Sequence, residues 1–298
     1  MISIVEVGPR DGLQNEKVFL SYQTKVAFIE KLSLAGVRRI EAGAFVSPKW
    51  VPQMADSKKV FKTLQHSQKL RKKTQLSALV PNLQGLEVAL ESGVNEIAIF
   101  GACSETFSQK NINCSIKESF KRFQEVIQLA KKNSVKVRGY LSTSFGCPYE
   151  GKVSLSRVEK IIRKMLELGV YEVSVGDTIG VATPKQVRNL LNRFEVSERQ
   201  KKLAMHFHDT RGTGLANVLA SLDLDIKTFD SSVGGLGGCP YAKGASGNLP
   251  TEDLVYMLHG MGLKSGIDLE KLIHVTHWIE KKLSHTLPAH VSKAGIFT

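Results

Sequence analysis

The sequence predicts a single domain, residues 1–298, folded as a closed (β/α)8 barrel with a C-terminal helical extension. Short apolar runs alternate with longer amphipathic segments through the whole chain, which is typical of α/β folds built on a parallel sheet. Eight such runs in 298 residues match the number and length that a closed barrel needs. The first turn after a strand reads GPRDG and not GxGxxG, which argues against a doubly wound dinucleotide-binding sheet.

The order of the elements follows from these runs. The expected strands are Ser3–Val7, Arg39–Ala42, Leu76–Val80, Glu96–Phe100, Val135–Leu141, Tyr171–Gly176, Leu203–His208 and Thr228–Val233. The helical patterns between them include Ser21–Ala35, Leu83–Ser92, Ile116–Lys132, Leu155–Leu168, Pro184–Glu195 and Gly214–Leu222. Thr251, followed by two acidic residues, opens another helix. Asp268–Leu283 forms a last one, which we expect to extend beyond the barrel and pack against its rim.

Helix start signals support several of these segments. Ser21, Ser115 and Ser154 stand where N-caps are expected, because a serine oxygen can accept the free N–H groups of a first turn. Thr183 precedes Pro184, a residue favoured at the first helical position.

The chain is strongly basic, with a formal net charge of +13 and an isoelectric point near 9.5. Most basic clusters stand where helices should end, so they read as solvated helix termini. Aromatic residues make up only 7%, which disfavours nucleic-acid binding, since such surfaces interleave bases with aromatic side chains. We expect a small anionic substrate, attracted by the overall positive field, and neither a nucleic-acid nor a membrane partner.

Cysteine usage and the chain start indicate a cytoplasmic protein. The four cysteines are scattered without CxxC spacing, and in a reducing compartment they should be free thiols. The first residues form a strand-like alternation instead of a signal or transit peptide. No run of eighteen apolar residues predicts a membrane-spanning helix.

The segment LAMHFHDTRGTG, residues 203–214, carries the strongest chemical signal. His206 and His208 are two residues apart on an expected strand, so both imidazoles point to the same face and can hold a divalent metal. Two histidines near a strand end are also common as ordinary polar residues at a rim. The residues at the other strand ends therefore decide between these readings.

The other strand ends carry further charged residues, and in this fold they form the active site. Arg10 and Asp11 lie in the first turn, Glu41 stands at the second strand, and Asp177 follows the sixth. The last strand runs into residues 234–248, where six glycines surround Cys239 before Asn248. So many glycines allow backbone to approach a ligand closely.

These strand ends together supply a mixed nitrogen and oxygen ligand set: Asp11, His206, His208 and Asn248. Such a set suits Mg²⁺ or Mn²⁺, with Zn²⁺ and Co²⁺ left open. A structural zinc site would use more thiolates. The ligands therefore suggest Lewis-acid catalysis on a substrate with adjacent oxygens.

Several stretches closely resemble the hydroxymethylglutaryl-CoA lyase family, in the same order from Ile4 to Asp253. They are GPRDGLQNE, EAGAFVSPKWVPQMAD, KNINCSI, FGCPYEG, GDTIGVATP, HFHDTRGTGLAN and GGLGGCPYAKGASGN. The resemblance implies metal-dependent cleavage of 3-hydroxy-3-methylglutaryl-CoA to acetyl-CoA and acetoacetate. It also implies an acyl-CoA partner and a homo-oligomer, a dimer or higher.

The resemblance further assigns roles to residues. The metal ligands would be Asp11, His206, His208 and Asn248. Arg10 and Gln14 would contact the substrate, with Arg10 stabilising the enolate of the departing acetyl-CoA. Cys239 would serve in acid/base proton transfer, and Glu41 and Asp177 would complete the catalytic set. From the chemistry alone, an imidazolium in the mouth could also give the proton, which makes His206 a further catalytic candidate.

The chemistry fits the residues without the family. Breaking a C–C bond beside a tertiary alcohol needs a deprotonated hydroxyl, a neutralised enolate oxygen and a proton donor. The alternatives are a related acyl-CoA condensing or aldol-type lyase, a nucleic-acid or membrane-surface protein, and a barrel that binds metal without catalysis.

Overall fold

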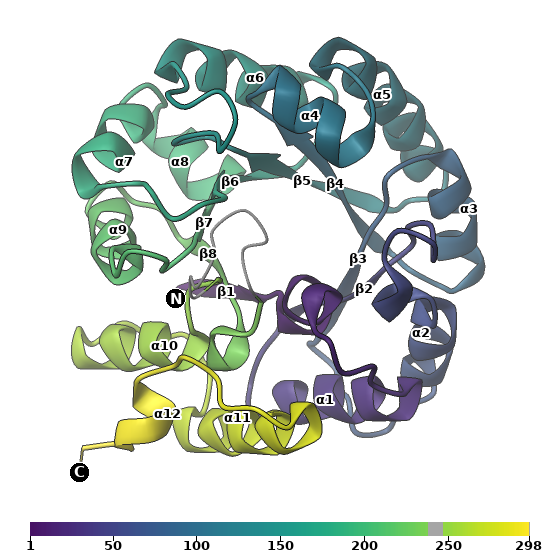
Figure 1. Ribbon diagram of the computed structural model, residues 1–298, viewed down its shortest axis with the longest axis vertical. Helices are drawn as coiled ribbons and strands as arrows, with labels where there is room; N and C mark the ends of the chain where they lie inside the picture. The colour runs from purple at the N-terminus through teal and green to yellow at the C-terminus, as the bar shows by residue number, and fades with distance from the viewer. Residues whose placement is uncertain (238–246, 298) are drawn as a thin grey trace.

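The protein is described from a computed structural model, which covers residues 1–237 and 247–297. Eight parallel strands pair in chain order and close into a barrel, with helices arranged around it (Figure 1). The predicted (β/α)8 barrel is therefore confirmed. The strands are β1 (Ser3–Glu6), β2 (Arg39–Ala44), β3 (Gln75–Leu79), β4 (Glu96–Ala102), β5 (Lys136–Ser142), β6 (Glu172–Asp177), β7 (Leu203–Phe207) and β8 (Thr228–Ser231).

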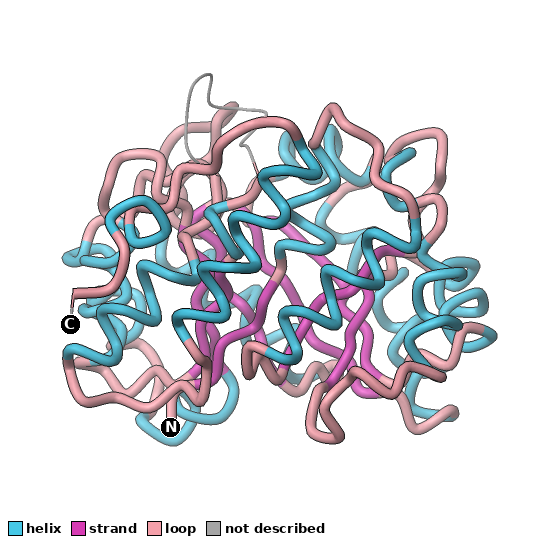
Figure 2. Tube along the Cα trace, turned by 90° about the horizontal axis from the view of Figure 1, so that it is seen from below, coloured by secondary structure: helices cyan, strands magenta, loops and turns pink. Residues whose placement is uncertain are grey.

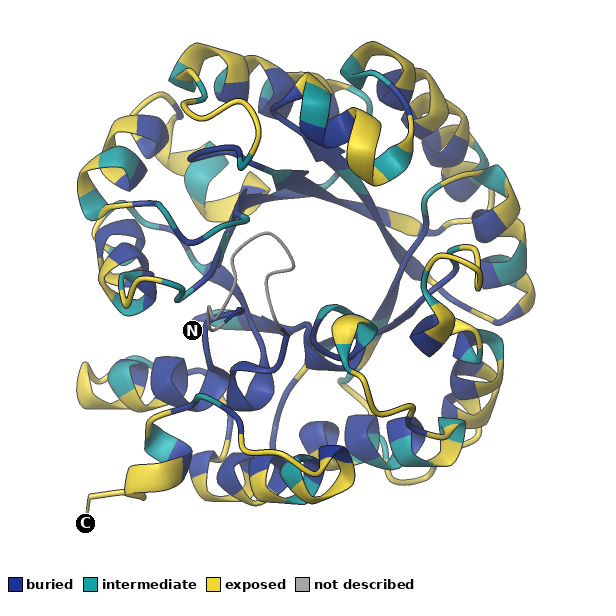
Figure 3. Cartoon of the chain, viewed as in Figure 1, coloured by how far each residue is buried: buried dark blue, intermediate teal, exposed yellow. Residues whose placement is uncertain are grey.

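Helices form the outer layer, and in the perpendicular view the strands lie inside it (Figure 2). The helices are α1 (Tyr22–Leu34), α2 (Ser57–Gln65), α3 (Leu83–Glu91), α4 (Glu105–Ile112), α5 (Ile116–Lys132), α6 (Leu155–Glu167), α7 (Pro184–Leu191), α8 (Val196–Lys202), α9 (Gly214–Leu222), α10 (Thr251–Gly260), α11 (Leu269–Leu283) and α12 (Val291–Ala294). Most of them bury one face toward the barrel and expose the other (Figure 3), whereas α8 has no buried residue and α11 packs on α1 and α10. None of the helices in the described part is long and apolar enough to cross a membrane.

The predicted caps form as expected. The hydroxyl oxygens of Ser21, Ser115 and Ser154 accept the backbone N–H groups of the residues three positions later. One predicted helix, Pro184–Glu195, is too long. α7 ends at Leu191, because Glu195 begins a second helix, α8, through a capping box with Glu198.

The first turn takes an unusual form. The GPRDG stretch forms η1 (Gly8–Gly12), a single wide helical turn in which the N–H groups of Arg10, Asp11 and Gly12 all donate to the Val7 carbonyl. This turn aims both charged side chains at the mouth of the barrel.

The C-terminal extension, α11 and α12, follows the eighth strand and its helix α10 and packs against the barrel, as predicted. Helix α11 lies beside α1, where the Trp278 and Phe28 rings stack with centroids 6.3 Å apart. After α11 the chain returns to the barrel, and the Ala289 N–H donates to the Gly234 carbonyl. The extension therefore supports the segment that follows β8.

The three cysteines within the described residues, Cys103, Cys114 and Cys147, are free thiols, as the sequence predicts. Cys239 and its neighbours, residues 238–246, lie outside the described residues.

Candidate active site

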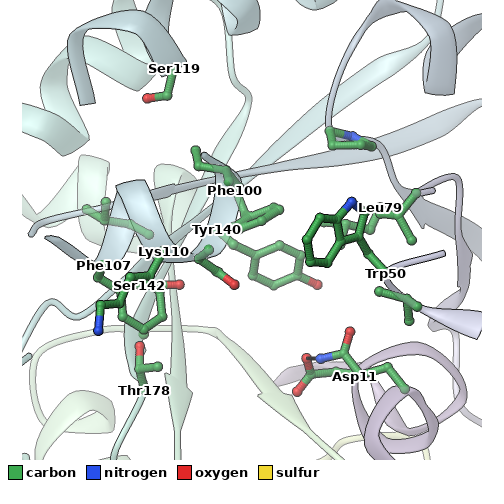
Figure 4. A pocket seen from close by; sticks show the side chains of 18 of the residues that line it. Asp11, Trp50, Leu79, Phe100, Phe107, Lys110, Ser119, Tyr140, Ser142 and Thr178 are labelled. Atoms are coloured by element: carbon green, nitrogen blue, oxygen red, sulfur yellow. Dashed lines mark hydrogen bonds between the residues drawn. The ribbon is translucent and has the colours of Figure 1, made fainter. Parts of the chain in front are cut away.

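A cavity of about 790 Å³ lies where the strands end at their carboxyl side. It is lined by η1, by the ends of β5, β6 and β7, and by residues of α4 and α5. Asp11 in η1, Tyr140 on β5 and Thr178 just after β6 face it, and Trp50 stands at its edge (Figure 4). The position matches the active-site end of this fold.

Three of the predicted metal ligands meet in this cavity. Asp11, His206 and His208 each offer a ligand atom, and these atoms all lie within 4.8 Å of one another. His206 lies in β7, and His208 follows the end of that strand. The predicted pairing of two imidazoles on one face is therefore present.

The fourth predicted ligand, Asn248, comes from the segment after β8. It forms an isolated antiparallel bridge with His208, and its Nδ2 donates to Asp11 Oδ2 at 2.9 Å and to the Leu236 carbonyl at 3.2 Å. Asn248 thereby joins the cluster of the other three residues.

Two buried atoms in this cluster have no hydrogen-bond partner among the described residues. They are Nδ1 of His208 and Oδ1 of Asn248. Buried polar atoms are rarely left unpaired, and an imidazole nitrogen and an amide oxygen are both good metal ligands. The donor set and these two free atoms fit a divalent cation.

The charges of the cluster also suit a cation. Burial by itself raises the pKa of Asp11, but Arg10, His206 and the Asn248 amide outweigh it, so the pKa lies below its usual value. Burial and the neighbouring His206 lower the pKa of His208 to about 3. At neutral pH the cluster therefore offers a carboxylate and a neutral imidazole.

Arg10 is buried beside the cluster and held on two sides. Its guanidinium lies 2.6 Å from Glu41 Oε2 and 2.6 Å from Asp11 Oδ1. The Tyr140 ring stands below it, 5.4 Å from Cζ to the ring centroid. Arg10 lines the cavity, whereas Glu41 does not and lies behind Arg10.

Comparisons with known proteins show the family of this chain. Residues 1–279 match the HMGL-like family. The chain is 48% identical to the mitochondrial hydroxymethylglutaryl-CoA lyase of Homo sapiens, over 98% of this chain and 89% of that protein. It is 49% identical to the cytoplasmic 3-hydroxy-3-methylglutaryl-CoA lyase of Danio rerio, over 98% and 86%. The chain belongs to the hydroxymethylglutaryl-CoA lyase family.

Solved structures of the family share the whole fold. The hydroxymethylglutaryl-CoA lyase of Pseudomonas aeruginosa aligns with a TM-score of 0.94 at 49% identity, covering 98% of this chain and 96% of that one. The enzyme of Acinetobacter baumannii, solved with coenzyme A and 3-methylmalate, aligns with a TM-score of 0.91 at 37% identity, covering 99% and 95%. The resemblance read from the motifs is confirmed, and so is the predicted enzyme class, a lyase.

Gln14 and Asp177, also predicted as site residues, differ in their surroundings. Gln14 lines the cavity and donates from Nε2 to Asp11 Oδ1 at 3.1 Å. Asp177 is buried at the end of β6, and both its oxygens accept backbone N–H groups, from Val181 and Ala182, at 2.9 Å. Its carboxylate thus holds the loop after β6, while Thr178 lines the cavity. A catalytic role for Asp177 stays a prediction, and Cys239 lies outside the described residues.

The sequence reading missed charged residues inside the barrel. Arg138 on β5 and Asp230 on β8 are nearly fully buried and lie 2.7 Å apart, from nitrogen to oxygen. Asp230 also lies 3.3 Å from the Nδ1 of His206. The available signal was a charged residue in the middle of each expected strand, since such residues are rarely buried without a partner.

Replacing Glu41 tests whether its ion pair with Arg10 stabilises the fold. Glu41→Gln should lower the free energy of unfolding by about 3 kcal/mol, because it leaves a buried guanidinium undercompensated. The measurement is urea unfolding of the purified variant. Glu91→Gln, in the exposed pair with Lys58, is the control and should change stability little. Equal losses in the two variants would contradict this account of Arg10.

Proposed function

We propose that this protein cleaves 3-hydroxy-3-methylglutaryl-CoA to acetyl-CoA and acetoacetate, with a divalent cation as its cofactor. The observation that carries the proposal is the Asp11, His206 and His208 cluster beside Arg10, in a chain about half identical to lyases named for this substrate. Such a cluster at the carboxyl end of a barrel is where this fold performs chemistry.

Asp11, His206, His208 and Asn248 would hold the cation, with Mg²⁺ or Mn²⁺ the best suited to the mixed ligands. When bound, it would lower the pKa of the substrate's tertiary hydroxyl and orient the neighbouring carboxylate. Arg10, Gln14 and the cluster line one continuous cavity, so a substrate held there would contact all of them.

The bond that breaks joins the carbon bearing the hydroxyl to the carbon next to the thioester. The Cys239 thiolate would take the proton of the tertiary hydroxyl. The electrons of that O–H bond would form the ketone of acetoacetate, and those of the C–C bond would form the enolate of acetyl-CoA. Arg10, buried and fixed by Glu41, would neutralise the charge that grows on the thioester oxygen. Because Arg10 is already in place, little reorganisation is needed during the reaction.

The enolate must then receive a proton on carbon. We assign this transfer to Cys239, which would return the proton it took from the hydroxyl, a role that follows the family resemblance. His206 lines the cavity and would contribute to catalysis as a ligand of the cation. Glu41 and Asp177 complete the proposed catalytic set. The contacts of Glu41 support a role through Arg10, and those of Asp177 a role through the loop after β6.

The same cavity can accept a long anionic substrate. It extends from Arg10 to Lys110 and Arg122, so two further cations line it away from the metal cluster. These cations and the net charge of +13 would attract the phosphates of an acyl-CoA. A homo-oligomer is part of the proposal because the family resemblance implies it. A cytoplasmic location is also proposed, and the similar lyases include both mitochondrial and cytoplasmic proteins.

Metal removal is the first test. Activity on 3-hydroxy-3-methylglutaryl-CoA, followed by acetoacetate release, should vanish in excess chelator and return with Mg²⁺ or Mn²⁺. His208→Ala should weaken Mn²⁺ binding by about 10–100-fold or more, as measured by electron paramagnetic resonance of free Mn²⁺. His259→Ala, on the exposed face of α10, is the control. Full activity in chelator by metal-free protein would overturn the metal proposal.

Arg10→Gln tests the role in the transition state. We expect kcat to fall by roughly 10²–10³-fold with a much smaller change in KM, because the guanidinium is needed most as the enolate forms. Arg122→Gln, at the other end of the cavity, should raise KM with little change in kcat. Steady-state kinetics separate the two, and an Arg10 variant that changes KM alone would make Arg10 a substrate anchor.

Cys239→Ala tests proton transfer. The variant should keep its fold and its Mn²⁺ affinity but lose most turnover, and an alkylating reagent should inactivate the native enzyme unless an acyl-CoA protects it. Cys114→Ala should retain substantial activity. A Cys239→Ala enzyme with near-normal kcat would contradict the assignment of proton transfer to Cys239.

A further inference from the structure

A buried carboxylate stands behind one of the proposed metal ligands. Asp230, in the middle of β8, is 1% exposed and does not line the cavity. Its Oδ2 lies 3.3 Å from Nδ1 of His206 and 2.6 Å from the Ser174 hydroxyl. Its two oxygens also accept from Arg138, at 2.7 and 3.2 Å.

The partners of Asp230 keep it an acceptor. Arg138 forms a two-point ion pair with the two Asp230 oxygens, at 2.7 and 3.2 Å, and such a pair holds a carboxylate and not a carboxylic acid. Ser174 can only donate to it. The contact with His206 therefore requires a hydrogen on Nδ1, because an ionised carboxylate has none to give.

This requirement sets the tautomer of the imidazole. With Nδ1 donating to Asp230, Nε2 of a neutral His206 carries the free lone pair. Nε2 is then the atom left for the ligand cluster with Asp11 and His208. The His206 ring is further confined by the edge of the Tyr140 ring, with centroids 6.4 Å apart.

A chain of ion pairs holds Asp230 from behind. Arg138 also pairs with Glu172 at 2.7 Å, and Glu172 pairs with Arg39 at 2.9 Å. All four side chains project into the barrel from β8, β5, β6 and β2, and three of them are less than 9% exposed. The carboxylate is thus fixed by rigid strands and not by a loop.

We propose that Asp230 is a positioning residue of the metal centre, which fixes His206 with its proton on Nδ1 and Nε2 directed to the cation. The inference rests on the proposed metal site. Partners that orient a ligating histidine commonly affect metal affinity by about 10–100-fold.

Asp230→Asn is the decisive variant. If the amide oxygen keeps the short contact with Arg138, the amide NH₂ faces His206 and favours a proton on Nε2, the wrong tautomer. The opposite orientation would set the NH₂ against the Arg138 donors. We expect the Kd for Mn²⁺ to rise by about 10–100-fold in a folded protein, measured by electron paramagnetic resonance.

Glu172→Gln is the matched control. It removes a buried carboxylate from the same arginine but does not touch His206. A general loosening of the ion pairs would affect both variants alike, whereas positioning predicts that Glu172→Gln changes the Kd for Mn²⁺ by less than about threefold. Similar affinity in Asp230→Asn and Glu172→Gln, in either direction, would overturn the proposal.

A second measurement needs no variant of the ion pairs. In metal-free native protein, at a pH where His206 is neutral, ¹⁵N spectra should show the His206 proton on Nδ1, with the signal assigned by its loss in His206→Gln. A proton on Nε2 overturns the positioning role even if Asp230→Asn fails to fold. Native protein that has this tautomer but binds no Mn²⁺ would instead overturn the metal site.

Discussion

The structure depends on the pairing of charges inside the barrel. Barrels of this fold usually fill their interior with layers of branched apolar side chains. Here Arg138 is paired with Asp230 and Glu172 in the same space. An unpaired buried charge costs several kcal/mol, so each side chain in such a group requires its neighbours in one arrangement. The barrel interior therefore gives up some apolar packing and gains fixed side-chain orientation.

This arrangement continues upward into the site. Arg10 repeats the pattern of Arg138, since both are buried, both pair with carboxylates from other strands, and both lie against the Tyr140 ring. Asp230, which pairs with Arg138, contacts His206, and Arg10 donates to Asp11. The residues proposed to meet the substrate are thus held by strands, and such support gives the fixed geometry that catalysis needs.

The sequence predicted what local chemistry determines. The short apolar runs located every strand to within two residues, and Ser21 was correctly predicted as a helix cap. The ligand set was predicted because strand ends of a barrel converge. The partners of Arg138 were not predictable, since the contact with Asp230 depends on the tilt and register of strands 92 residues apart in sequence. The helix break at Glu195 was missed because its capping signal lies inside a continuous amphipathic pattern.

The segment after β8 shows why two further buried carboxylates matter to the site. Glu6 accepts the Val233 N–H and the Thr251 hydroxyl, and Glu252 accepts the Gly234 N–H. Gly234 has a φ of 68° and lies against Leu287, so a side chain there would be both strained and crowded. The chain leaves β8 in one fixed direction, and on its return Asn248 is pinned to His208 by a β-bridge. The described residues on either side of the glycine-rich stretch are therefore held by buried groups, the first side by Glu6 and Glu252 and the second by His208, a proposed metal ligand.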